Sequence, residues 1–324
     1  MRISTIEGGH SSDRGDRSLS LCFRSTRVHL RGLHTRTPVE RCTDEHHLHF
    51  SLFSAYTQPN RCLAMALMQP LLADAQLRPV GHQFNPYSEN GGTILAIAGA
   101  DFAVIAGDTR QTEGYSIQTR YAPKVFKLTD RAVLAVNGFQ ADCSEFVKRV
   151  LQRIEWYRHA HSKQMPLKAI ARMIQTMLYG KRFFPYYTYN ILGGIEEDGT
   201  GAVYSFDPVG SYEREACRAA GAASSLIQPF LDNQIYFKNQ TPAPGAAPFV
   251  PGNLPIDVVL PIVIDSFTSA TERHIEVGDG LEIFIVLAKG RDASQLSSLN
   301  ATEIPAADPT GERVFVVRRD LKKD

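Results

Sequence analysis

Two short apolar runs lying close together constrain the fold of this chain more than any other feature. The runs are Thr93–Ala98 and Phe102–Ala106, both apolar and partly β-branched, and Gly99–Asp101 separates them. Short runs of this composition, bounded by glycine and aspartate, are typical of buried strands. The pattern predicts two antiparallel strands joined by a tight turn.

The order of the segments that follow predicts a layered fold. Apolar residues recur at helical spacing over Ala141–His159 and Leu167–Tyr179. Two more helices are expected near Ser224–Leu231 and Ile256–Thr271. The further strands expected are Ala132–Val136, Tyr189–Ile195, Ala202–Phe206, Leu281–Ala288 and Val314–Arg318. The order along the chain is strands, two helices, strands, helices and strands. This order favours an α+β sandwich with the helices outside.

The chain changes character near residue 80. No lysine precedes Lys124, whereas arginine is frequent before residue 80, and residues 1–60 show little sustained periodicity. We expect an N-terminal extension or propeptide over 1–82 that is disordered or in part an error of gene prediction. Its Arg and Ser content suits a transit peptide, but its acidic residues do not. The main domain is expected over 83–324, with a proline-rich surface insertion at about 239–255, since neither helix nor sheet tolerates such a density of proline.

Composition and charge exclude several classes of protein. Apolar residues make up 43% of the chain, and the net charge is +1 with 35 basic and 34 acidic residues, so the basic surplus expected of a nucleic-acid partner is missing. No apolar run is long enough to span a membrane. His46, His47 and His49 have no Cys/His framework around them, so we expect a solvated tract and neither a metal nor a cofactor. Five cysteines without CxxC spacing favour a reducing compartment.

Several longer motifs resemble one known family. Residues Gly92–Arg110 read GTILAIAGADFAVIAGDTR and are similar to the opening hairpin of proteasome beta subunits. The other matching segments are Lys181–Tyr187 (KRFFPYY), Gly201–Tyr212 (GAVYSFDPVGSY), Gln228–Gln234 (QPFLDNQ), Phe267–Arg273 (FTSATER) and Gly278–Leu281 (GDGL). Together they resemble the beta type-1 (beta-6) branch of that family in a fungal form. The resemblance implies an α+β fold, a four-layer α/β/β/α sandwich of the N-terminal nucleophile hydrolase type.

The resemblance also implies where an active site would lie. Active members use an N-terminal threonine, released by self-cleavage, whose hydroxyl attacks the peptide carbonyl while its own amine serves as base. Asp108 and Lys124 match the family's supporting aspartate and lysine, but the nucleophile position falls on Gly92, which has no side chain. Three further positions that are polar in active members are here Ala222, His274 and Val277. We therefore expect a degenerate site without a catalytic residue, in which Asp108 and Lys124 remain as a structural ion pair.

Thr93 carries the alternative hypothesis, an active threonine endopeptidase. Cleavage after Gly92 would expose Thr93 as an N-terminal threonine. Successive side chains of a strand point to opposite faces, so a shift of one residue turns this hydroxyl away from Lys124. A β-bulge would restore the alignment. We prefer the interpretation that Thr93 is an ordinary strand residue.

The resemblance implies assembly rather than catalysis by this chain alone. It implies a non-catalytic subunit of the 20S core particle, placed in a heteroheptameric beta ring with the opposite beta ring, alpha-ring subunits and assembly chaperones as partners. Such particles degrade proteins, including ubiquitin-tagged ones, in cytoplasm and nucleus. Because Gly92 cannot cut the chain, a neighbouring subunit is expected to trim it near His82–Gln83. A stand-alone binding scaffold of the same fold is a third hypothesis.

Overall fold

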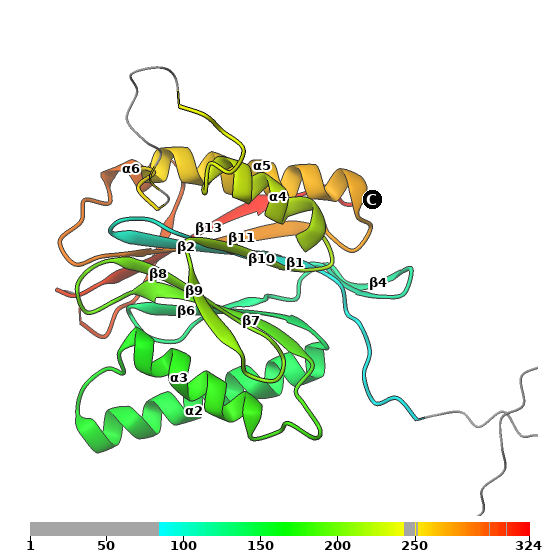
Figure 1. The fold of residues 1–324 in the computed structure, drawn as a ribbon, viewed down its shortest axis with the longest axis horizontal. Coiled ribbons are helices and arrows are strands. Elements are labelled where there is room, and N and C mark those ends of the chain that lie inside the picture. The colour runs from blue at the N-terminus through cyan, green and yellow to red at the C-terminus, as the bar shows by residue number, and fades with distance from the viewer. Residues whose placement is uncertain (1–83, 243–249, 251, 298, 309) are drawn as a thin grey trace, which may run out of the picture. The chain divides into compact units, whose positions relative to one another are not determined.

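Two antiparallel sheets form the centre of the fold (Figure 1). The computed structural model describes residues 84–242, 250, 252–297, 299–308 and 310–324. The larger sheet contains, in spatial order, β10 (Cys217–Gly221), β1 (Thr93–Ala98), β2 (Phe102–Asp108), β11 (Gly280–Leu287), β13 (Arg313–Asp320) and β12 (Thr302–Ile304). The smaller sheet contains β5 (Val125–Lys127), β6 (Ala132–Gly138), β7 (Thr188–Ile195), β8 (Gly201–Phe206) and β9 (Tyr212–Glu215). A separate hairpin pairs β3 (Gln111–Glu113) with β4 (Ser116–Thr119).

Helices cover the outer face of each sheet. The pair α2 (Gln140–His161) and α3 (Leu167–Tyr179) lies on the smaller sheet, and the pair α4 (Ser224–Gln234) and α5 (Ile256–Arg273) lies on the larger one (Figure 1). A short helix, α6 (Ser294–Ser297), precedes β12. The four layers confirm the predicted α+β, α/β/β/α sandwich.

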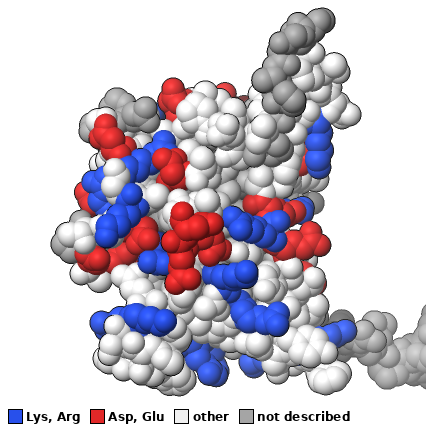
Figure 2. Space-filling model, turned by 60° about the vertical axis from the view of Figure 1, so that its left-hand side comes forward, with Lys and Arg blue, Asp and Glu red and all other residues white. Residues whose placement is uncertain are grey.

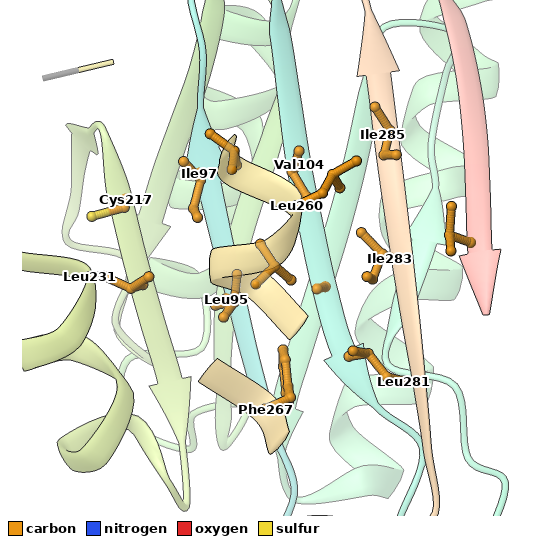
Figure 3. Close-up of a cluster of buried hydrophobic side chains, with 14 of the residues drawn as sticks. Leu95, Ile97, Val104, Cys217, Leu231, Leu260, Phe267, Leu281, Ile283 and Ile285 are labelled. Carbon is orange, nitrogen blue, oxygen red and sulfur yellow. The ribbon is translucent and has the colours of Figure 1, made fainter. Parts of the chain in front are cut away.

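The strands of the hairpin β1–β2 are buried on both faces. Leu95 and Ile97 belong to the apolar cluster between the larger sheet and helices α4 and α5, whereas Ile94 and Ala96 belong to the cluster between the two sheets. Figure 3 shows the first of these clusters, with side chains of β1, β2 and β11 gathered around α5. Each strand therefore supplies two apolar layers at once, and this explains its uninterrupted apolar sequence.

The predicted elements are all present, with ends that differ by a few residues. The strand predicted at Thr93–Ala98 and the helix predicted at Leu167–Tyr179 match β1 and α3 at both ends. The prediction missed the short strands β3, β4, β5, β9, β10 and β12. These strands have three to five residues and lie at sheet edges or in the small hairpin, where polar residues such as those of β9 (YERE) hide the alternating pattern.

Several sequence features lie outside the described residues. These are the extension over 1–82, with His46, His47 and His49, and residues 243–249 and 251 of the proline-rich insertion. Among the described residues, no helix is long and apolar enough to cross a membrane, and no group of three His, Cys, Asp or Glu side chains is arranged to hold a metal ion. Acidic and basic side chains intermingle over the upper and middle parts of the face shown in Figure 2, and its lower part shows basic side chains.

Candidate functional site

Lys124 and Asp108 form a buried ion pair beside Gly92. Asp108 is the last residue of β2 and Lys124 directly precedes β5, so the pair links the larger sheet to the smaller one. Lys124 Nζ lies 3.3 Å from Asp108 Oδ1. It also donates hydrogen bonds to the backbone carbonyls of Asp108, at 3.0 Å, and Arg110, at 2.6 Å. Each of the three ammonium protons can therefore have a partner inside the protein.

The Asp108 carboxylate is held by two backbone amides as well as by Lys124. The Thr93 N–H donates to Oδ1 at 2.8 Å and the Gly278 N–H donates to Oδ2 at 3.4 Å. Burial raises the pKa of Asp108 above its ordinary value, and the Lys124 ammonium and the two N–H donors oppose that rise. Removal of either charged partner would leave the other buried and uncompensated, so the pair behaves as one structural unit.

Gly92 has no room for a side chain in its present conformation. Its φ is +76°, a left-handed value that favours glycine. A Cβ on Gly92 would overlap Lys124 Cε and would lie 2.6 Å from Nζ and 2.9 Å from Asp108 Oδ1. The space in which a nucleophile would stand at this position is therefore filled by the Lys124 side chain.

The Thr93 hydroxyl lies on the other face of β1. Its oxygen accepts a hydrogen bond from the Ala223 N–H, at 2.9 Å, where helix α4 begins. Thr93 is fully buried, and the two-residue period of a strand puts its side chain on the same face as Leu95 and Ile97. Figure 3 shows that these two side chains point toward the outer helices. Strand β1 pairs with β2 and β10 without a shift of register, so no bulge brings this hydroxyl around to Lys124.

The three remaining positions supply no acid or base to the ion pair. Ala222 has a methyl group, and its N–H donates to the Gly92 carbonyl at 2.9 Å. Val277 is 1% exposed and belongs to the apolar cluster beneath α4 and α5. His274 follows the last residue of α5, and its Nδ1 accepts a hydrogen bond from the Glu276 N–H at 3.3 Å. The His274 imidazole is thus engaged with its own loop.

A cleft of about 790 Å³ opens beside these residues. The lining includes residues of β7, β8 and β9, together with Gly91, Gly221, Ala222, His274 and Glu276. Among the described residues that line it, Thr93 and Lys124 are absent. The cleft therefore reaches neither the threonine hydroxyl nor the lysine ammonium.

Arg110 organises the same region and was missed by the sequence analysis. Its guanidinium is buried, pairs with Asp279 at 2.6 Å and donates to the Ile275 carbonyl at 2.8 Å. Its own carbonyl accepts the shortest hydrogen bond of Lys124. A charged residue two positions after an apolar strand is the signal that could have revealed it, since a buried charge needs arranged partners.

Comparison with known proteins assigns the family. The model of the proteasome subunit family matches residues 88–243. Proteasome subunit beta type-6 of Saccharomyces cerevisiae is 58% identical over 222 residues, which cover 67% of this chain and 92% of the relative. The chain belongs to the proteasome beta subunit family. Proteasome subunit beta type-1 of Danio rerio is 51% identical over 212 residues, covering 65% of this chain and 87% of the relative. The probable proteasome subunit beta type-6 of Schizosaccharomyces pombe is 48% identical over 218 residues, covering 64% and 93%.

These relatives confirm the resemblance drawn from the motifs. A proteasome beta subunit of the type-1 or type-6 branch accounts for the GTILAIAGADFAVIAGDTR hairpin and for the sandwich of helices and antiparallel sheets. The identity of 58% to the yeast relative fits the fungal form of the sequence. Subunits of this family form a protease complex in which a threonine is the nucleophile. The arrangement around Gly92 therefore bears directly on function.

Proposed function

We propose that this proteasome beta subunit is a non-catalytic, structural part of the 20S core particle, and that it is no enzyme on its own. The observation that carries the proposal is the geometry at Gly92, where Lys124 fills the space of a side chain and all three of its protons have acceptors. Covalent catalysis needs a nucleophile next to a base, and Gly92 supplies none. Ala222, His274 and Val277 are the further positions of the degenerate site.

We also propose the assembly that the family resemblance suggests. This chain assembles with other proteasome subunits, and we place it in a heteroheptameric beta ring that contacts an opposite beta ring and alpha-ring subunits, with assembly chaperones acting before completion. Exposed aromatic side chains at the end of α3 and directly after it support a role in subunit contacts. Tyr179 is 64%, Phe183 100% and Phe184 62% exposed, and such residues are favoured at protein interfaces. We expect the particle in cytoplasm and nucleus.

The proposal includes the fate of the N-terminal extension. Residues 83–324 would form the mature domain, and residues 1–82 would be removed by a neighbouring subunit near His82–Gln83. Self-cleavage is not available to a chain whose nucleophile position is glycine.

N-terminal analysis of this chain, isolated from assembled particles, tests the proposal. We expect a mature end upstream of Gly92, while an active beta subunit from the same particle, used as the control, begins with threonine. A mature end at Thr93 would favour the alternative of an active threonine endopeptidase. A stable, functional monomer in gel filtration would instead favour the stand-alone scaffold.

A further inference from the structure

Residues 87–91, called the strap here, lie as an extra extended segment between β3 and the end of β6. The Asn90 N–H donates to the Gly138 carbonyl at 3.3 Å, and the Thr112 N–H donates to the Asn90 carbonyl at 3.0 Å. The backbone of Asn90 thus pairs with both β3 and the end of β6, as the backbone of a peptide does when it is added beside a strand.

The Asn90 side chain adds a second set of contacts on the same two sides. Its Nδ2 donates to the Thr112 carbonyl at 3.2 Å, and its Oδ1 accepts a hydrogen bond from the Gln140 N–H at 2.9 Å. Asn90 is 8% exposed. Gln140 is the first residue of α2, whose early N–H groups have no partner within the helix. A carboxamide, which both donates and accepts, satisfies this position, and an apolar side chain would not.

Contacts on both sides of Asn90 hold the rest of the strap. The Tyr87 hydroxyl donates to the Pro185 carbonyl at 2.7 Å, and its ring packs against Phe139, Phe184 and Tyr187. The Gly91 carbonyl accepts a hydrogen bond from Asn137 Nδ2 at 2.9 Å. Gly91 has a φ of +65°, and a Cβ there would overlap Thr112 Oγ1, so the groove fits a glycine after the asparagine.

We propose that the groove between β3 and the end of β6 is a binding site for an extended peptide carrying an Asn-Gly pair, and that the strap is its permanent occupant. The inference rests on the proposed function in one respect: a chain that cannot cut itself before Thr93 keeps the strap after trimming. The strap then excludes other peptides from the surface leading to Gly92, independently of the missing nucleophile. Trimming must also occur upstream of Tyr87.

A buried thiol beneath the strap reports whether the groove is filled. A small cavity of about 30 Å³ is lined by Asn90, Gly91, Lys124, Gln140 and Cys143, among others. Cys143 is 5% exposed, and burial raises the pKa of its thiol to about 12. Cys217 is 0% exposed, and burial also raises the pKa of its thiol to about 12, but it lies in a different apolar cluster, under α4 and α5. Cys217 is therefore the internal control for loss of the whole fold.

The experiment is pulsed labelling of the full chain with iodoacetamide, followed by peptide mass spectrometry. Asn90→Ala should speed the labelling of Cys143 at least tenfold and leave Cys217 unchanged. The matched control is Ser88→Ala, on the same strap, whose hydroxyl has no hydrogen bond within the described part of the chain; it should change neither rate by more than twofold. A synthetic peptide of residues 84–92 should slow Cys143 labelling in the Asn90→Ala variant, and the same peptide with alanine for the asparagine should not.

Two results with the Asn90→Ala variant would overturn the proposal. One is an unchanged Cys143 rate in Asn90→Ala; the other is protection by the alanine peptide equal to that by the asparagine peptide. If Asn90→Ala speeds the labelling of both thiols, the fold is lost. Tyr87→Phe then replaces it under the same criteria, because it removes the hydrogen bond to the Pro185 carbonyl and keeps the ring contacts. Fast labelling of Cys143 in the unaltered chain, without cleavage before Thr93, contradicts the proposal about the strap and leaves the proposed function standing. Fast labelling together with a mature end at Thr93 contradicts the proposed function as well.

Discussion

Neutralising Asp108 should destabilise the fold strongly, although the substitution is nearly isosteric. Asp108→Asn leaves the Lys124 ammonium, whose side chain is 9% exposed, with two carbonyl acceptors and no counter-charge. Breaking a buried ion pair on one side costs about 3–5 kcal/mol. Because Lys124 keeps its two carbonyl bonds, we expect the lower end, about 3 kcal/mol. Lys124→Met should cost a similar amount, since it leaves a fully buried carboxylate with only the N–H groups of Thr93 and Gly278.

Urea unfolding of the full chain and its variants measures these losses. For a domain of this size we expect the midpoint of unfolding to fall by roughly 1 M in each single variant. The double variant Asp108→Asn/Lys124→Met has no unpaired charge, so it should lose about 3 kcal/mol rather than the roughly 6 kcal/mol of two independent effects. The exposed pair Arg149–Glu145 is the control, and Glu145→Gln should leave the midpoint unchanged.

The refuting result is additivity. If the losses of the two single variants add in the double variant, Asp108 and Lys124 are not one unit and the ammonium is stabilised elsewhere. Single variants as stable as the unaltered chain would contradict the burial argument altogether.

Further predictions concern the backbone at Gly92, the ion pairs of Asp279 and the exposed surface. Gly92→Ala should destabilise the chain more than Gly114→Ala, because both glycines have positive φ but only the first would press a Cβ onto Lys124; urea midpoints decide this, and equal losses would refute it. Although burial favours its neutral form, hydrogen bonds from Arg110 and Arg120 lower the pKa of Asp279, so its stabilising effect is present above about pH 4 and is lost as the pH falls through the folded-state pKa. Asp279→Asn should therefore lower the urea midpoint at pH 7, and asparagine tolerates the positive φ of this site. The difference in urea midpoint between the unaltered chain and the variant should narrow toward pH 3. A difference that does not depend on pH would contradict this. Phe183→Ala should leave the urea midpoint unchanged but reduce incorporation into particles, measured by native gel, and unaltered incorporation would remove Phe183 from the contact surface.

The layers of this fold could be predicted because the apolar residues of their strands and helices follow recognisable patterns along the sequence. The apolar runs of β1 and β2 and the helical spacing of α3 are local patterns that burial enforces directly. Strands such as β9 and β10 could not be found in this way. They are short, and β10 pairs with β1, more than a hundred residues earlier, through backbone hydrogen bonds that do not depend on the side chains.

The residues of the candidate site likewise fall into those that could be predicted from local sequence and those that could not. Gly92, Asp108 and Lys124 were found because the motif fixes their spacing, and the direction of Thr93 followed from the two-residue period of a strand. The role of Asn90 could not be inferred, because its partners Thr112, Gly138 and Gln140 come together only in the folded chain. The same holds for Arg110, whose carbonyl and guanidinium serve different partners.

The most direct test of the central claim is to treat intact particles with a threonine-directed covalent inhibitor and to examine this chain by mass spectrometry. The active subunits of the same particle serve as the positive control for the reagent. The structure predicts that Thr93 stays unmodified and within the chain, since its hydroxyl is buried against the Ala223 N–H on the face opposite Lys124. An inhibitor adduct on an N-terminal Thr93 would contradict the claim that this subunit does not cut peptides.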